Sequence, residues 1–175
     1  MRNLMLLPLF GLLLPLAGCA SGTVRVPLTD GSSEFKEVQK LDCRVYDEKT
    51  KSLTVGLSFS VLFGAAAMGP QVTSAEVTGV KWDKSVQYIV AQYKEVCSRY
   101  NAGAVSQASY DNRITEIDQL YMEAIGVRQN AEAVLRGHSR EAFGDLDKET
   151  GGGDQAAAAQ QVVSAVDALY AKTGQ

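Results

Sequence analysis

The stretch from Asp83 to Tyr100 reads DKSVQYIVAQYKEVCSRY and carries the clearest structural signal in the chain. Its apolar residues recur in steps of three and four, which is the spacing of one face of an α-helix. They are Val86, Ile89, Val90, Tyr93, Val96, Cys97 and Tyr100. Asp83 is a favoured N-cap residue type, and Asn101 to Gly103 is a typical helix end. The pattern predicts an amphipathic helix of about eighteen residues.

A longer helical pattern follows Ser106, a residue type that caps helices. Its apolar positions alternate in steps of four and three up to residue 145, a spacing typical of a coiled-coil seam. Gly151 to Gly153 ends this pattern, and residues 156–172 form a third amphipathic stretch after the candidate cap Asp154. Tight turns make neighbouring helices antiparallel. We therefore expect a long central helix flanked by two shorter antiparallel helices.

Upstream of these helices, apolar residues alternate with polar ones, which is the period of a half-buried β-strand. The alternating segments are residues 37–46, 52–63 and, more weakly, 72–80. Asp47 to Thr50 is polar and predicts a turn between the first two strands. The expected fold class is α+β, a small antiparallel sheet of two or three strands followed by the helices.

The first eighteen residues differ in character from the rest of the chain. Met1 to Gly18 carries one charged residue, Arg2, and an apolar run that is shorter than a membrane-spanning helix and typical of a signal peptide. The run ends in Leu16-Ala17-Gly18-Cys19, which resembles the lipobox of bacterial lipoproteins. That resemblance implies cleavage before Cys19, a diacylglycerol on its thiol, and acyl chains such as palmitate that hold the protein to a membrane.

The lipobox resemblance also implies a location and a domain organisation. In two-membrane bacteria, an Asp after the lipidated cysteine tends to retain lipoproteins in the inner membrane, so Ala20 favours the outer membrane. We expect the protein to face the periplasm there. The predicted segments are a signal peptide over 1–18, a lipidated flexible tether over 19–35, a small β region over 36–82, and a helical, coiled-coil-like region over 83–175.

Residues 99–111 read RYNAGAVSQASYD and resemble the turn of the short helical hairpin called SHOCT, a small bacterial module. In that module a helix ends at a glycine, and an apolar residue and a capping Ser or Thr precede the next helix. The likeness extends over residues 99–125 and departs from the family at Gln107, where the module usually carries Glu. It implies a helical hairpin that supports oligomerisation or partner contact, with no catalytic residues.

Cys43 and Cys97 remain as a pair once Cys19 carries lipid. Cys43 shares one face of an alternating segment with Leu41 and Val45, and Cys97 lies on the apolar side of the first helix. Both thiols then point toward the core in an oxidising compartment, so we expect a disulfide between them. Two separately buried thiols are the alternative.

Charge and motif content argue against several function classes. The chain has 17 Lys and Arg against 20 Asp and Glu, a net charge of -3, and no basic block that would indicate nucleic-acid binding. The lone histidine, His138, accompanies neither cysteine at metal-ligand spacing, and residues 145–149 are not followed by the glycine and glutamate of a calcium loop. No phosphate loop or nucleophile motif is recognisable. We expect neither a metal, nor a cofactor, nor enzymatic activity.

Together these patterns predict an outer-membrane lipoprotein with a non-catalytic structural or partner-binding role in the cell envelope. The long seam shows more apolar surface than one neighbouring helix covers, so its far half, residues 131–146, is expected to bind a second copy or a helical partner. Ile125, Leu135 and Phe143 mark that surface. Two alternatives stay open: a binding module for an apolar ligand or lipid, and an oligomer that inserts the strand 53–63 into a membrane as part of a β-hairpin.

Overall fold

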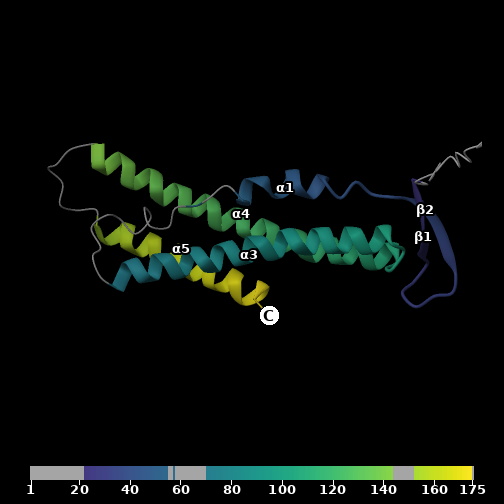
Figure 1. The fold of residues 1–175 in the computed structure, drawn as a ribbon. Helices are drawn as coiled ribbons and strands as arrows, with labels where there is room; N and C mark the ends of the chain where they lie inside the picture. The colour runs from purple at the N-terminus through teal and green to yellow at the C-terminus, as the bar shows by residue number, and fades with distance from the viewer. Residues whose placement is uncertain (1–21, 55–56, 58–69, 144–151, 175) are drawn as a thin grey trace, which may run out of the picture.

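Three long helices form most of the structure: α3 (Pro70–Asn101), α4 (Gln107–Phe143) and α5 (Gly152–Thr173). The computed structural model describes residues 22–54, 57, 70–143 and 152–174, and their side chains except those of 70–75, 138–143 and 152–156. Figure 1 shows an elongated body in which the three helices run side by side, with a β-hairpin across one end. With 37 residues, α4 is about 55 Å long.

The apolar faces of the three helices meet in one core. Ile89 and Tyr93 of α3, Ala124 and Ala131 of α4, and Val166 of α5 all have 0% of their surface exposed. α5 packs against both α3 and α4, which also pack against each other. Each helix therefore has two helical neighbours, and the apolar stripe of each faces a partner rather than water.

The β-hairpin consists of β1 (Thr23–Pro27) and β2 (Phe35–Gln39), which pair in antiparallel fashion with Val24 opposite Val38. The loop that joins them contains Gly31 with a φ of 78°, a left-handed conformation that glycine adopts without steric strain. Both strands thus belong to one local unit that precedes all the described helices in the sequence.

This hairpin lies against the turn between α3 and α4. Val26 of β1 is 1% exposed and belongs to the same core as the helices. At Gly103, in the turn, an added Cβ would lie 2.2 Å from the backbone oxygen of Arg25, so strand and turn meet closely. The backbone N–H of Ser106 donates a 2.9 Å hydrogen bond to Asp30 in the hairpin loop. The hairpin therefore closes one end of the helical body.

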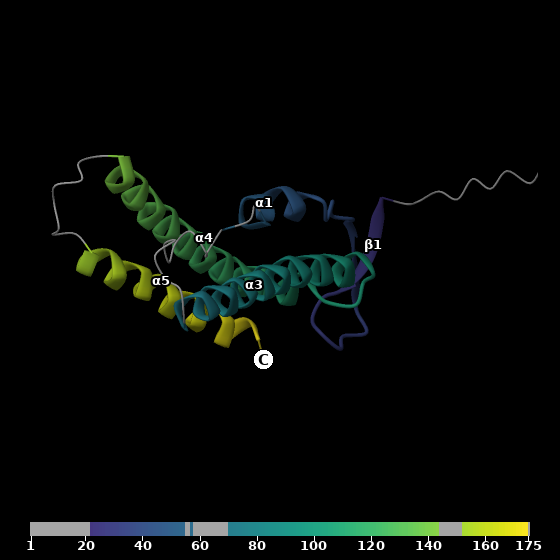
Figure 2. The ribbon, with the colours of Figure 1, turned by 60° about the vertical axis from the view of Figure 1, so that its left-hand side comes forward.

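A short helix, α1 (Val45–Thr54), lies along α3 and α4, as Figure 2 shows from a second side. Thr50 and Leu53, both 1% exposed, face the long helices. The hydroxyl of Thr50 donates to the backbone oxygen of Tyr46 at 2.7 Å, so this buried polar group is satisfied inside the helix. α1 contributes a fourth helical layer on one side of the body.

The predicted fold class is confirmed: a two-stranded antiparallel sheet precedes the helices, and the longest helix stands between two shorter ones. The predicted turn is also confirmed. Gly103 has a φ of 70°, and Ser106 accepts a 3.2 Å hydrogen bond from the backbone N–H of Ser109, as an N-cap does. Residues 144–151, between α4 and α5, lie outside the described residues, whereas Gly152 and Gly153 of the predicted second turn belong to α5.

The positions of the strands were predicted correctly only in part: residues 37–39 of the predicted strand 37–46 lie in β2. Residues 72–80 belong to α3, so Asp83 lies inside that helix and does not cap it. Residues 45–54, predicted as the end of one strand, a turn and the start of another, form α1. Of the predicted strand 52–63, only 52–54 and 57 are described. β-propensity is a weak preference, and the 2% exposure of Thr78 shows that packing against neighbouring helices outweighs it here.

Three further expectations need correction. The predicted tether over 19–35 contains β1 and the first residue of β2, and its residues Thr29, Gly31, Ser32 and Ser33 belong to the loop that joins the two strands. Within the β region predicted over 36–82, the described residues 45–54 and 70–82 are helical. Asp154 lies inside α5, which begins at Gly152, and does not precede the helix as a cap.

None of the helices in the described ranges has the length and apolarity of a membrane-spanning segment.

Candidate functional site

A disulfide joins the segment before α1 to the last turns of α3. Cys43 and Cys97 are 54 positions apart in the sequence, and their Cα atoms lie 5.8 Å apart. Cys97 is completely buried, as its place on the apolar side of the helix predicted. The predicted disulfide is therefore present, although Cys43 lies just before a helix and not on a strand.

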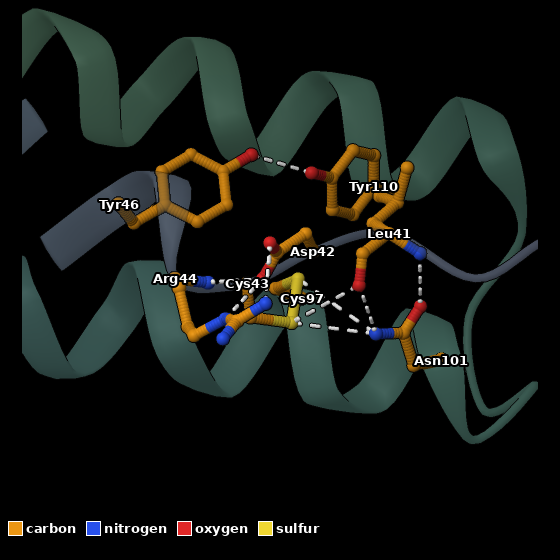
Figure 3. The surroundings of a disulfide bond; sticks show 8 residues. All are labelled: Leu41, Asp42, Cys43, Arg44, Tyr46, Cys97, Asn101 and Tyr110. Carbon is orange, nitrogen blue, oxygen red and sulfur yellow. Dashed lines mark hydrogen bonds and ion pairs between the residues drawn. A yellow bond between two sulfur atoms is a disulfide. The ribbon is translucent and has the colours of Figure 1, made fainter. Parts of the chain in front are cut away.

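The side chain of Asn101 reinforces this junction (Figure 3). Its Oδ1 accepts a 2.8 Å hydrogen bond from the backbone N–H of Leu41, and its Nδ2 donates one of 2.8 Å to the backbone oxygen of the same residue. Nδ2 also lies 3.3 Å from the sulfur of Cys43. Asn101 thus binds both polar groups of one extended residue, much as a neighbouring strand would, and positions the chain for the disulfide.

Aromatic rings extend the junction from the disulfide along α1. The ring of Tyr46 stacks on that of Tyr93, with centroids 4.6 Å apart, and its hydroxyl lies 2.5 Å from the hydroxyl of Tyr110. The ring of Tyr110 in turn packs against Tyr100, at 4.7 Å between centroids. Ring pairs of this kind contribute about 0.5–1.5 kcal/mol each beyond their burial. They connect α1 to both long helices.

Lys49 occupies the centre of the contact between α1 and the long helices. Its Nζ lies 2.5 Å from Oδ1 of Asp118, and 5.1 and 5.2 Å from the ring centroids of Tyr93 and Tyr121. The hydroxyl of Tyr93 donates to the same carboxylate, and the hydroxyl of Tyr121 donates to the backbone oxygen of Lys49 at 3.0 Å. Each polar group of this set therefore has a partner.

We call these residues the α1 clamp. Its members are Cys43, Tyr46, Lys49, Tyr93, Cys97, Asn101, Tyr110, Asp118 and Tyr121. They come from α1 and the segment before it, from α3 and from α4. The clamp combines a covalent bond, ring stacking and a central ion pair, and it holds α1 against the two long helices α3 and α4.

The ionisation of the clamp suits binding and not proton transfer. Burial raises the pKa of Tyr93, and the hydrogen bond to Asp118 raises it further. Burial also raises the pKa of Tyr110, together with its hydrogen bond to Tyr46. Both phenols therefore keep their protons around neutral pH, and Tyr93 donates its proton in the hydrogen bond to Asp118. A lysine already paired with a carboxylate and enclosed by two rings is poorly placed to act as a nucleophile.

The predicted partner surface is less open than expected. Ile125 and Leu135 are partly buried and pack against the core, and the side chain of Phe143 lies outside the described residues, as does Cys19. Ala131, at the start of the half that was expected to stay open, is 0% exposed. α5 packs against α4, and α3 begins earlier than predicted, so the helices cover more of the apolar surface than expected. That a partner binds this half of α4 stays a prediction.

Two hollows open on the surface of the described residues. One, of about 280 Å³, lies between the end of α3 and the start of α4 and is lined mainly by polar and charged side chains, among them Arg99 and Arg113. The other, of about 470 Å³, is a shallow groove between α3 and the end of α5, beside Tyr88 and Tyr170. Neither is an apolar pocket between sheet and helices.

Within the described ranges, no cluster of His, Cys, Asp and Glu could hold a metal ion.

Comparison of the chain with family models, curated proteins and solved structures found no match. The interpretation of the clamp therefore depends on its own geometry. That geometry places a dense set of paired side chains between α1 and the two long helices, α3 and α4.

Sequence reasoning found the two cysteines of the clamp but not its centre. The sequence predicts a polar turn from Asp47 to Thr50, and a turn of this kind gives Lys49 no partner in the core. A signal was available, because Tyr46, Thr50 and Leu53 follow a helical step of four and then three. The stronger alternation downstream of Leu53 concealed this step. Asp118 lies on a predicted helix, but its ion-pair partner Lys49 comes from α1, which was not predicted.

The central ion pair can be tested with a double-mutant cycle. We expect Lys49→Met and Asp118→Asn to show a coupling energy of about 1 kcal/mol in urea unfolding, because the pair is partly shielded from water and lies against two rings. The matched control is Lys51 with Glu48, which lie 3.9 Å apart on the exposed side of α1. That pair should show a coupling near zero. Equal coupling in the two cycles would contradict the central role of Lys49.

Proposed function

We propose that the protein is an outer-membrane lipoprotein, anchored by lipid on Cys19, whose helical body has a non-catalytic structural or partner-binding role in the envelope. The observation that carries this proposal is the disulfide between Cys43 and Cys97. Structural disulfides persist outside the reducing cytosol. The disulfide thus supports export independently of the signal-peptide pattern and of Leu16-Ala17-Gly18-Cys19.

The rest of the structure supports a mechanical role more than a chemical one. The clamp holds α1 to α3 and α4 through a covalent bond and paired polar groups, and this rigidity suits a fixed scaffold. Tyr93 and Tyr110, the buried phenols, have raised pKa values and stay protonated. A body of this kind presents constant surfaces to a partner while its lipid keeps it at the membrane.

The proposed partner is a second copy of the chain or a helical protein, as the SHOCT-like turn and the seam suggested. Ile125 and Leu135 keep part of their surface accessible, although less than expected. The alternative is a module that binds an apolar ligand, which requires a large apolar pocket between sheet and helices.

The anchor is tested with Cys19→Ser in cells grown with labelled palmitate. We expect this variant to lose the label and to leave the membrane fraction, because serine has no thiol for the diacylglycerol. Ser21→Ala is the matched control and should stay acylated and membrane-bound. Ala20→Asp should move the acylated protein from the outer to the inner membrane. Labelled Cys19→Ser protein in the outer membrane would refute the lipobox assignment.

A further inference from the structure

The hairpin end of the molecule is the end that a lipid anchor would hold. β1 begins at Thr23, four positions after Cys19. Four fully extended residues span at most about 14 Å. A chain anchored at Cys19 therefore keeps the start of β1 within that distance of the bilayer surface, while the far end of α4 lies about 55 Å away along the helix.

Exposed apolar side chains gather at this same end. Phe35, the first residue of β2, is 58% exposed, and Leu28, which follows β1, is 49% exposed. The cross-strand register places Phe35 on the face of the hairpin opposite to Val24 and Val38, which pack against the core. Leu41, after β2, is 38% exposed. Figures 1 and 2 both show the hairpin lying across the end of the helical body.

We propose that the hairpin end rests on the bilayer, with the side chains of Phe35 and Leu28 in the interfacial region, so that the helices project away from the membrane. This inference rests on the proposed lipid anchor at Cys19. Aromatic and aliphatic side chains partition into the headgroup boundary of a bilayer, where an amphipathic element lies about 5–10 Å deep. A short connection to the lipid brings the hairpin within that range.

The contact is apolar and not electrostatic. From Thr23 to Val45, basic and acidic side chains are equal in number: Arg25, Lys36, Lys40 and Arg44 against Asp30, Glu34, Glu37 and Asp42. Glu37 lies opposite Arg25 in the sheet, and Arg44 pairs with Asp42 at 3.0 Å. A surface without net charge is neither attracted to anionic lipid nor released from it by salt.

The test uses the full, acylated protein in vesicles of phosphatidylethanolamine and phosphatidylglycerol. A photoreactive phenylalanine analogue replaces Phe35 or Leu28, and lipid adducts are measured by mass spectrometry. Val80 of α3 and Met122 of α4 are matched controls, because they are 54% and 63% exposed but lie along the helices. We expect about tenfold more adduct at the two hairpin positions, since a side chain in the interface is in continuous contact with lipid. The yield should not change when salt is raised.

The outcomes of this test distinguish a failure of the proposed membrane contact from a failure of the lipid anchor. A protein that is not acylated at Cys19 and does not float with the vesicles would overturn the anchor and, with it, the premise of the inference. An acylated protein that floats but gives equal adduct at all four positions would overturn the inference alone. Strong adducts at Val80 or Met122 would show a body that lies flat on the membrane, which also contradicts it.

Discussion

The variant Cys43→Ala with Cys97→Ala is expected to lower the free energy of unfolding by about 2–4 kcal/mol. The disulfide joins residues that are 54 positions apart in the sequence. Removing it lets the unfolded chain adopt many more conformations. This loss is a large share of the roughly 5–15 kcal/mol that stabilises a typical domain. Urea unfolding of a form that begins at Ser21 measures it.

Reduction of the wild-type protein is the control for this prediction. A reductant should lower the stability of the wild type by a similar amount and leave the double variant unchanged. Hydrogen exchange should accelerate most in α1, because the clamp then holds this helix through Tyr46, Lys49 and their partners alone. A double variant as stable as the oxidised wild type would show that the disulfide is dispensable for the clamp.

Gly103→Ala should be the most damaging single change to the turn between α3 and α4. Gly103 has a φ of 70°, which costs a residue with a Cβ roughly 1–2 kcal/mol. The new Cβ would also lie 2.2 Å from the backbone oxygen of Arg25, and a backbone atom cannot move aside as a side chain can. We therefore expect a loss of about 2–4 kcal/mol, with displacement of the hairpin from the turn.

Gly126→Ala is the matched control, because Gly126 lies inside α4 and an added Cβ there meets nothing within 4 Å. Alanine is the better helix former by about 0.8–1.0 kcal/mol, so this variant should be slightly more stable than the wild type. Thermal unfolding of both variants gives the comparison. A Gly103→Ala protein as stable as Gly126→Ala would contradict the close contact between β1 and the turn.

Helical periodicity was the reliable part of the sequence. The stripes from Val86 to Tyr100 and from Tyr110 to Leu135 predicted α3 and α4 because each has more than two turns of apolar residues on one face. The turn at Gly103 and Ser106 was also predicted correctly. The left-handed conformation of the glycine and the capping hydrogen bond of the serine involve only residues close to them in sequence. Local chemistry was enough for these features.

The strands were predicted less well because alternation over a few residues is ambiguous. Val77, Thr78 and Val80 are β-branched and favour a strand by themselves, yet they lie in α3. β1 was hidden in a segment that looked like a linker, whereas residues 37–39 of β2 were predicted as the start of a strand. Their pairing becomes stable only where Val26 is buried against the helical turn, and no local pattern reveals that contact.

The amino-acid sequence by itself determined the helical stripes and the turn at Gly103, because each follows from residue types and short-range spacing. The pairing of Cys43 with Cys97 followed instead from the number of cysteines and the expected oxidising compartment. Only the tertiary structure decided that α1 is a helix, that Lys49 lies between two tyrosines, and that α5 covers the seam at Ala131. These features arise from contacts between segments far apart in the chain. Burial against such partners stabilises a conformation by more than the small differences in local propensity that oppose it.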